Sequence, residues 1–168
     1  MALPDAAGAR HFQDELEQLK ARLLEMGGMA EEQVRLAVKG LVDRDRDLIA
    51  RVLVGDGPLN ALHIEVDNRC FMLLALYQPM AVDLRAIVAA VKINTDLERV
   101  GDLAINIAEA GQRYVGHAPV KKLIDIPRMA SIAQRMLRDA LDAFVRRDTD
   151  SDQSRRGLDV RDRQADRR

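Results

Sequence analysis

The chain has 168 residues, enough for one domain or one domain and part of a second, and its formal net charge at pH 7 is −1. Hydrophobic residues make up 48% of it and charged residues 32%, a balance that fits a soluble globular protein and excludes wholesale disorder. The near-neutral charge creates no global attraction to nucleic acid or anionic lipid, and no apolar run is long enough for a signal peptide or a membrane span. We therefore expect a cytoplasmic protein that does not bind nucleic acid.

The composition also limits the kind of core. Aromatic residues make up 3% of the chain and tryptophan is absent, so the core has to be built from aliphatic residues, methionine and alanine, as in helix bundles. The single cysteine, Cys70, excludes an internal disulfide. Its place beside an apolar helix face favours a buried, unreactive thiol.

The first predicted helix carries one continuous apolar stripe whose positions step by three or four residues. The stripe consists of Phe12, Leu16, Leu19, Leu23, Met26, Ala30, Val34, Ala37 and Leu41. The charged segment DRDRD, 43–47, marks the end of this helix. A second helical region starts at Asp47 and is interrupted by GDGP at 55–58, where Pro58 suits the first turn of a new helix.

The remaining helices follow from proline and loop signals. The helix that begins at Pro58 ends near Gln78–Pro79, because proline disfavours a helical residue before it. A third long helix is predicted at about 82–114, and a fourth at about 127–147. The fourth carries the apolar residues Met129, Ile132, Met136, Leu137, Ala140 and Phe144. No segment shows the alternation of a strand, so the sequence predicts an all-α fold of nearly antiparallel helices.

Acidic residues occupy the apolar stripe of the third predicted helix. The stripe runs through Leu84, Val88, Val91, Thr95, Glu98, Asp102, Ile105 and Glu109. We therefore predict that its three carboxylates face neighbouring helices, where an unpaired carboxylate costs several kcal/mol to bury. Arginines, protons or bound cations would offset that cost. Three small residues in the same stretch would let a neighbouring helix approach closely: Gly101, Ala104 and Ala108.

A metal ion is one candidate for the positive charge. Glu98 and Asp102 are one turn apart and could bind the same ion, and Glu65 could supply a third carboxylate from the preceding helix. Oxygen ligands alone favour hard cations such as Mg²⁺, Ca²⁺, Mn²⁺ or Fe³⁺. The alternative is that these carboxylates are solvated or paired with arginine. Arg99 is adjacent to Glu98, and Glu65 stands four residues before Arg69, which is the spacing of a surface ion pair.

Two further observations concern possible chemistry. His63 and Asp67 are also spaced for one ion, although a solvated pair explains the same spacing. None of the three histidines completes the E-x-x-H pattern of di-iron bundles, and the chain has neither H-E-x-x-H nor a glycine-rich phosphate loop. The sequence therefore predicts no catalytic residues, and we expect a protein that is not an enzyme.

The run QPMAVDLRAIVAAVKINTDLERVGDLAINIAE, 78–109, resembles the signature of the PhoU family of bacterial phosphate-signalling regulators. The loop Gln78–Pro79, VDLR at 82–85, ERVGD at 98–102 and NIAE at 106–109 stand in the family's order, and the resemblance covers about residues 10–150. It implies two tandem three-helix bundles, each with an E(D)-x-x-x-D motif that holds a multinuclear iron or zinc cluster in some members.

The resemblance assigns residues and partners. Glu98 and Asp102 match the metal motif, and Glu65 matches an acidic position on the preceding helix. Further ligands or supporting residues would come from nearby positions: Asn94, Arg99, Asn106 and Glu109. Family members restrain the phosphate-starvation response as adaptors between a phosphate ABC transporter, through its ATPase subunit, and a sensor histidine kinase. They reach the membrane through these partners only, and a second copy of the chain is a further candidate partner.

Two functions of other classes remain as alternatives. The bundle could store metal or act as a metalloenzyme, although the missing E-x-x-H pattern argues against di-iron chemistry. It could also be a structural interaction module in which arginines neutralise the acidic residues.

A weak internal repeat suggests how the chain is organised. Shifted by 103 residues, AVKGLVDRDRD at 37–47 aligns with ALDAFVRRDTD at 140–150, but no counterpart of LIARVLVGD follows. The last 18 residues instead contain 6 Arg and 4 Asp and carry no apolar stripe. Our hypothesis is a second repeat that is truncated, with out-of-frame sequence at its end; a natural charged tail is the alternative. The expected parts are a flexible 1–9, a first three-helix bundle at 10–117, the first helix of an incomplete second bundle at 118–150 and a disordered or irregular tail at 151–168.

Overall fold

The computed structural model of the protein describes residues 6–118 and 121–165; of residues 6, 7, 9 and 147–165 it describes the backbone alone. The described residues form five helices and no strand: α1 (Ala6–Asp43), α2 (Arg46–Val54), α3 (Asp56–Tyr77), α4 (Val82–Val115) and α5 (Asp125–Ala165). This confirms the predicted all-α fold. No helix within the described ranges combines the length and the apolar character needed to cross a membrane.

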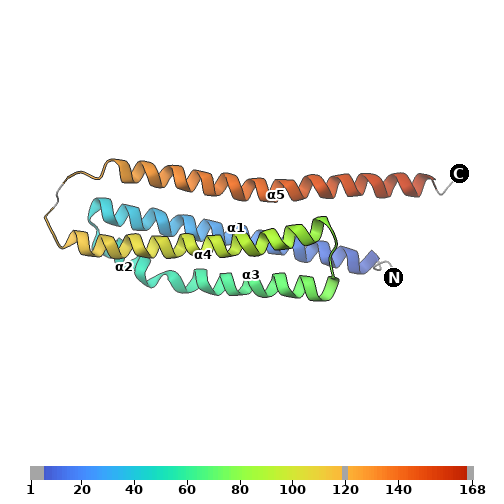
Figure 1. Cartoon of the computed structure of the whole chain (residues 1–168), viewed down its shortest axis with the longest axis horizontal. Coiled ribbons are helices and arrows are strands. Elements are labelled where there is room, and N and C mark those ends of the chain that lie inside the picture. The colour runs from blue at the N-terminus through green and yellow to red at the C-terminus, as the bar shows by residue number, and fades with distance from the viewer. Residues whose placement is uncertain (1–5, 119–120, 166–168) are drawn as a thin grey trace.

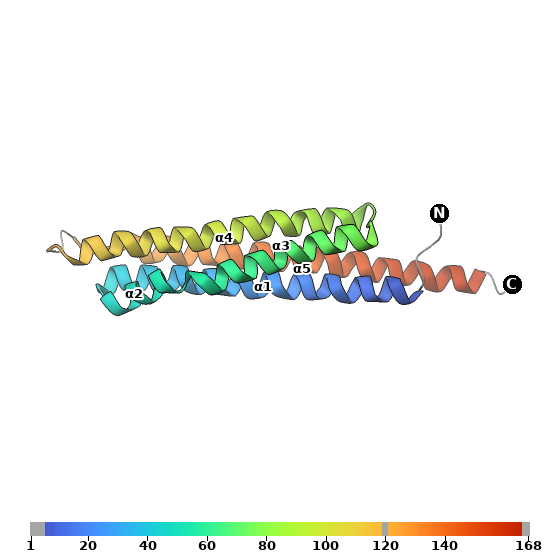
Figure 2. The ribbon, with the colours of Figure 1, turned by 90° about the horizontal axis from the view of Figure 1, so that it is seen from below.

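The helices form an elongated bundle (Figure 1). α1 and α4 run along its whole length and contact each other, while α2 and α3 follow one another along the same two helices. α5 lies along α1, as Figure 2 also shows, and its end reaches past the first turn of α1. A main core fills the space between α1, α3 and α4, and a smaller core lies under α2.

The connections between the helices lie where the sequence predicted them. After α1, Arg44 adopts a left-handed φ of 58°, and the N–H of Asp45 donates to the carbonyl of Gly40 at 2.9 Å, which closes the helix end. The Asp45 carboxylate then accepts hydrogen bonds from the first backbone N–H groups of α2. α3 ends at Gln78, which is also left-handed and precedes Pro79.

The stripe of α4 that was predicted to face inward is wrong. The helix is rotated, so that a neighbouring stripe is buried instead. Leu84 is 40% exposed, Val88 is 44% exposed and Glu109 is exposed to solvent. The buried residues of α4 are Ile87, Ala90, Asn94, Leu97, Gly101, Ala104, Ala108 and Gly111. Both stripes have helical spacing, but the buried one consists largely of small residues and one asparagine. A count that follows large apolar side chains therefore selects the neighbouring stripe.

Small residues on this buried face allow close helix packing, as the sequence predicted. A Cβ atom at Gly101 would lie 2.2 Å from Leu59 Cδ2, and one at Gly111 would lie 3.2 Å from Ile49 Cδ1. Gly101 therefore leaves room for Leu59 of α3, and Gly111 gives Ile49 of α2 a close contact with α4.

The apolar residues predicted for α5 are divided between a packed face and an exposed one. Met129, Ile132 and Met136 are exposed, and α5 instead packs through Leu141, which is 7% exposed and belongs to the main core. Leu137 and Phe144 contact the same core. α5 therefore folds back on the first bundle and leaves a second apolar face uncovered.

Polar contacts also hold α5 against α1. Gln134 Nε2 donates to the Glu31 carbonyl at 3.2 Å, and Arg138 Nη1 pairs with the Glu31 carboxylate. A Cβ atom at Gly27 of α1 would lie 2.2 Å from Leu141 Cδ1, so this glycine lets the leucine enter the core.

The ends of the chain differ from their predictions. α1 already includes residues 6–9, which were expected to be flexible, and residues 1–5 lie outside the described part. α5 continues as a helix through 151–165, where an irregular tail was expected, and 166–168 lie outside the described part. The tail contains no proline, and its six arginines are good helix formers, which is compatible with a helix despite Gly157.

The packing of α5 can be tested with Leu141→Ala. Removal of this buried side chain should weaken the docking of α5 by ~2–4 kcal/mol, because it leaves a cavity against α1. Hydrogen exchange should become faster in α5 while α3 and α4 keep their protection. Met136→Ala is the matched control, since Met136 is 67% exposed, and it should change exchange little. Equal effects of the two substitutions would contradict the packing face assigned to α5.

Candidate functional site

A buried asparagine connects α4 to α3. Asn94 is 0% exposed, and its Nδ2 donates to the carbonyl of His63 and to Asp67 Oδ1, both at 3.0 Å. Asn94 Oδ1 is buried and has no hydrogen-bond partner among the described residues. Buried amide groups are retained only where hydrogen bonds offset their desolvation, so Asn94 fixes which side of α4 faces α3.

His63 and Asp67 do not form an ion site with a third ligand. The Asp67 carboxylate is engaged by Asn94, and His63 Nδ1 is buried without a hydrogen-bond partner among the described residues. In the part of the chain that the structure describes, no three His, Cys, Asp or Glu side chains come together as ligands for one ion. Asp67 therefore has a structural role, as the acceptor of a hydrogen bond from Asn94.

Glu98 and Asp102 lie beside the buried face of α4. Glu98 is half-buried and Asp102 is exposed, one turn apart on the same side of the helix. They follow Asn94 by four and by eight residues, so along α4 they lie progressively to one side of the buried asparagine. Within the described ranges neither carboxylate makes a hydrogen bond or an ion pair, and Arg99 is not paired with them.

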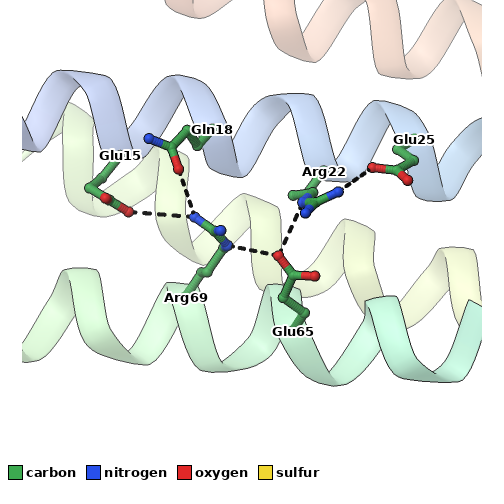
Figure 3. A network of polar contacts seen from close by, with 6 residues as sticks. All are labelled: Glu15, Gln18, Arg22, Glu25, Glu65 and Arg69. Atoms are coloured by element: carbon green, nitrogen blue, oxygen red, sulfur yellow. Dashed lines mark hydrogen bonds and ion pairs between the residues drawn. The ribbon is translucent and has the colours of Figure 1, made fainter.

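Glu65 is held on the other side of α3, in a polar network with α1 (Figure 3). Glu65 Oε1 accepts hydrogen bonds from Arg22 Nε and Arg69 Nε, both at 3.0 Å. Arg69 Nη1 also donates to Gln18 at 3.1 Å and pairs with Glu15 at 3.5 Å. The arginine pairing that the sequence offered as the alternative for Glu65 is therefore present. Glu65 does not join Glu98 and Asp102 in a group of three ligands.

The remaining candidates do not add a ligand to this pair. Asn106 and Glu109 are exposed further along α4, and Asn94 is buried with its amide directed at α3. Two neighbouring carboxylates without a cationic partner suit one oxygen-binding ion whose remaining ligands are solvent. A multinuclear cluster would need ligands beyond those that the described residues bring together. Metal binding at Glu98 and Asp102 stays a prediction.

The Cys70 thiol lies in the same region of α3 and is buried, as the sequence predicted. Burial raises the pKa of Cys70, and the negative charge of Asp67 raises it further, from 9.0 to about 11. The thiol is therefore protonated at neutral pH, which disfavours nucleophilic and redox chemistry at this position.

Comparison with known proteins shows which family this helical arrangement resembles. The family model for the PhoU domain matches residues 23–111. A PhoU homolog of Caulobacter vibrioides, a phosphate-specific transport system accessory protein, is 41% identical over 140 residues, which cover 83% of this chain and 61% of the relative. The PhoU accessory protein of Serratia marcescens is 34% identical over 139 residues, which cover 83% of this chain and 57% of the relative.

A solved structure agrees with these matches. The crystal structure of PhoU from Pseudomonas aeruginosa superposes with a TM-score of 0.76 at 37% sequence identity. The superposition covers 80% of this chain and 65% of that one. The chain thus spans about three fifths of the length of the relatives that it matches.

The pKa of Cys70 predicts a fall in stability at high pH. The thiol ionises near pH 9.0 in the unfolded chain and near pH 11 in the folded one, so the folded state holds more protons between these values. Its contribution is complete below pH 9.0, and the free energy of unfolding should fall by ~1–3 kcal/mol as the pH rises to 11. Urea unfolding at both ends of this window measures the change. Cys70→Ala should lack this part of the pH dependence, and an unchanged slope in the variant would contradict the assignment.

Proposed function

Since the chain belongs to the PhoU family, we propose that it regulates phosphate uptake and restrains the phosphate-starvation response, without being an enzyme. The observation that carries this proposal is the match to the PhoU domain, together with 34–41% identity to accessory proteins of phosphate-specific transport systems.

The proposed role is that of an adaptor. The chain would bind the ATPase subunit of a phosphate ABC transporter and a phosphate-sensing histidine kinase, in the cytoplasm and at the membrane only through these partners. Long helices with mixed apolar and charged surfaces, such as the exposed sides of α4 and α5, suit binding of this kind.

Metal binding belongs to the same proposal. Glu98 and Asp102 would hold a hard divalent cation such as Mg²⁺, Mn²⁺ or Ca²⁺, or contribute to an iron or zinc cluster. Support comes from their spacing of one turn and from the lack of an arginine partner within the described ranges. A bound cation would neutralise the two carboxylates beside the Asn94 contact and so stabilise the approach of α3 and α4.

A structural module is the second candidate function, and the Glu65 network favours it. Glu65 is already neutralised by two arginines, so this acidic position needs no metal ion. The two candidate functions differ in whether Glu98 and Asp102 bind a metal ion. Direct measurement of bound metal therefore distinguishes them.

Metal binding is tested with the double variant Glu98→Gln/Asp102→Asn. We expect chelator-stripped wild type to bind Mn²⁺ saturably in isothermal titration, and the double variant to lose at least ~10-fold in affinity, because both ligand charges are removed. Asp96→Asn is the matched control, because Asp96 is exposed elsewhere on α4 and should leave the affinity unchanged. Equal binding by wild type and the double variant would reject the site and leave the structural module as the better account.

The adaptor role is tested in a bacterial strain that lacks its own PhoU. The chain should lower a phosphate-starvation reporter when phosphate is plentiful and should bind the transporter ATPase in a pull-down. We expect weaker repression than that by a full-length relative, because the chain spans about three fifths of such a protein. An ATPase from an unrelated ABC transporter is the control. Binding to neither partner, together with an unchanged reporter, would reject the proposal.

A further inference from the structure

The end of α1, the end of α4 and the segment before α5 lie at one end of the bundle (Figure 1). Residues from these three parts of the chain line a basic cavity. Its volume is about 340 Å³, and it is lined by Val42, Arg44, Tyr114, Lys121, Lys122 and Leu123. These residues are distinct from Glu98, Asp102 and the Glu65 network. Three of the six carry a positive charge, and none is acidic.

Arg44 is fixed in place by several contacts. Its Nη2 donates to the carbonyl of Val115 at 3.0 Å and to that of His117 at 2.5 Å. The guanidinium also lies over the ring of Tyr114, 5.1 Å from its centroid. Nη1 is buried and has no hydrogen-bond acceptor among the described residues. Part of the hydrogen-bonding capacity of this preorganised guanidinium is therefore unused.

The charge of this cavity is not balanced by carboxylates. Within the described ranges, Arg44, Lys121 and Lys122 form no ion pair with an acidic side chain. The acidic residues adjacent to Arg44 are engaged elsewhere, because Asp43 pairs with Lys39 at 2.5 Å and Asp45 caps α2. The carboxyl ends of α1 and α4 supply partial negative charge, and Arg44 Nη2 already binds the carbonyl of Val115, the last residue of α4, and that of His117 just beyond it.

We infer that this cavity binds a phosphate-type oxyanion, either inorganic phosphate or the phosphate group of a small ester. The Arg44 guanidinium and the two lysine ammonium groups provide donors of the kind that bind phosphate oxygens. Val42, Leu123 and the Tyr114 ring give the cavity an apolar wall, and its volume exceeds that of a bare phosphate ion. A small organic group or ordered water therefore fits beside the anion.

The inference stands on residues outside the proposed metal site, so it does not depend on the proposed function. It does connect two parts of the fold. Lys121 and Lys122 lie just before α5, whereas Arg44 lies in the turn between α1 and α2. An anion bound by all three cations would fasten the start of α5 to the body of the bundle.

The test is a titration of the purified chain with each ligand at constant physiological ionic strength. Binding is measured by calorimetry and by the NMR signals of the Tyr114 ring. One arm uses inorganic phosphate and the other uses glycerol 3-phosphate. We expect saturable binding in at least one arm, and the arm with the higher affinity identifies the form of phosphate that the cavity takes. Absence of saturable binding in both arms would overturn the inference.

The variant Lys121→Ala/Lys122→Ala separates this site from diffuse attraction. Both lysines are exposed, so the fold should be kept while affinity falls by at least ~10-fold. The control is Lys92→Ala/Arg85→Ala, which removes the same charge from exposed positions of α4 away from the cavity and should leave affinity unchanged. Arg44→Lys keeps the charge but removes the guanidinium fork, and it should also weaken binding. Equal losses in the two double variants would show non-specific attraction and overturn the inference.

Discussion

The close contact of α4 with the helices around it is the constraint on which the arrangement depends. α4 presents Gly101, Ala104, Ala108 and Gly111 to its neighbours. Leu59 occupies the space that a Cβ atom would take at Gly101, and Ile49 packs closely against Gly111. Such a face can be buried only with these small residues inward, so packing density fixes the rotation of α4. That rotation places Asn94 inside and leaves Glu98 and Asp102 at the margin.

The helices could be predicted from the sequence because local residues determine where they end. Asp45 caps α2, Arg44 takes the left-handed conformation that closes α1, and Pro79 follows the end of α3. Rotation of each helix could not be predicted equally well, because it depends on the neighbours. In α4 the large apolar side chains of Leu84 and Val88 led the sequence pattern to select the wrong face. The small residues of the buried face make the closer contacts.

The candidate site was predicted in part, for the same reason. Glu98 and Asp102 are neighbours on one side of α4, as their spacing requires, but their depth of burial follows from rotation and is smaller than expected. Whether Glu65 faces α4 or α1 depends on the orientation of α3, and the arginines of Figure 3 hold it toward α1. Arg44 and the two lysines are separated by more than seventy positions, and no short motif unites them. Only the fold brings them to one cavity.

α5 contacts the core of the first bundle, and the segment that leads into it lines the basic cavity. Its middle is held by Leu141 in the core and by Arg138 at Glu31, whereas its start adjoins the basic cavity. Gln134, Leu137 and Phe144 also contact the first bundle, so the described contacts of α5 lie in its middle part, after the segment that leads into it. Charge at Lys121 and Lys122 acts on that segment directly, since like charges close together repel and an anion between them reverses the repulsion. The apolar residues on the outer side of α5, Met129 and Met136 among them, are exposed. An anion in the basic cavity would therefore lie close to the segment that leads into α5, the helix that carries this exposed apolar surface.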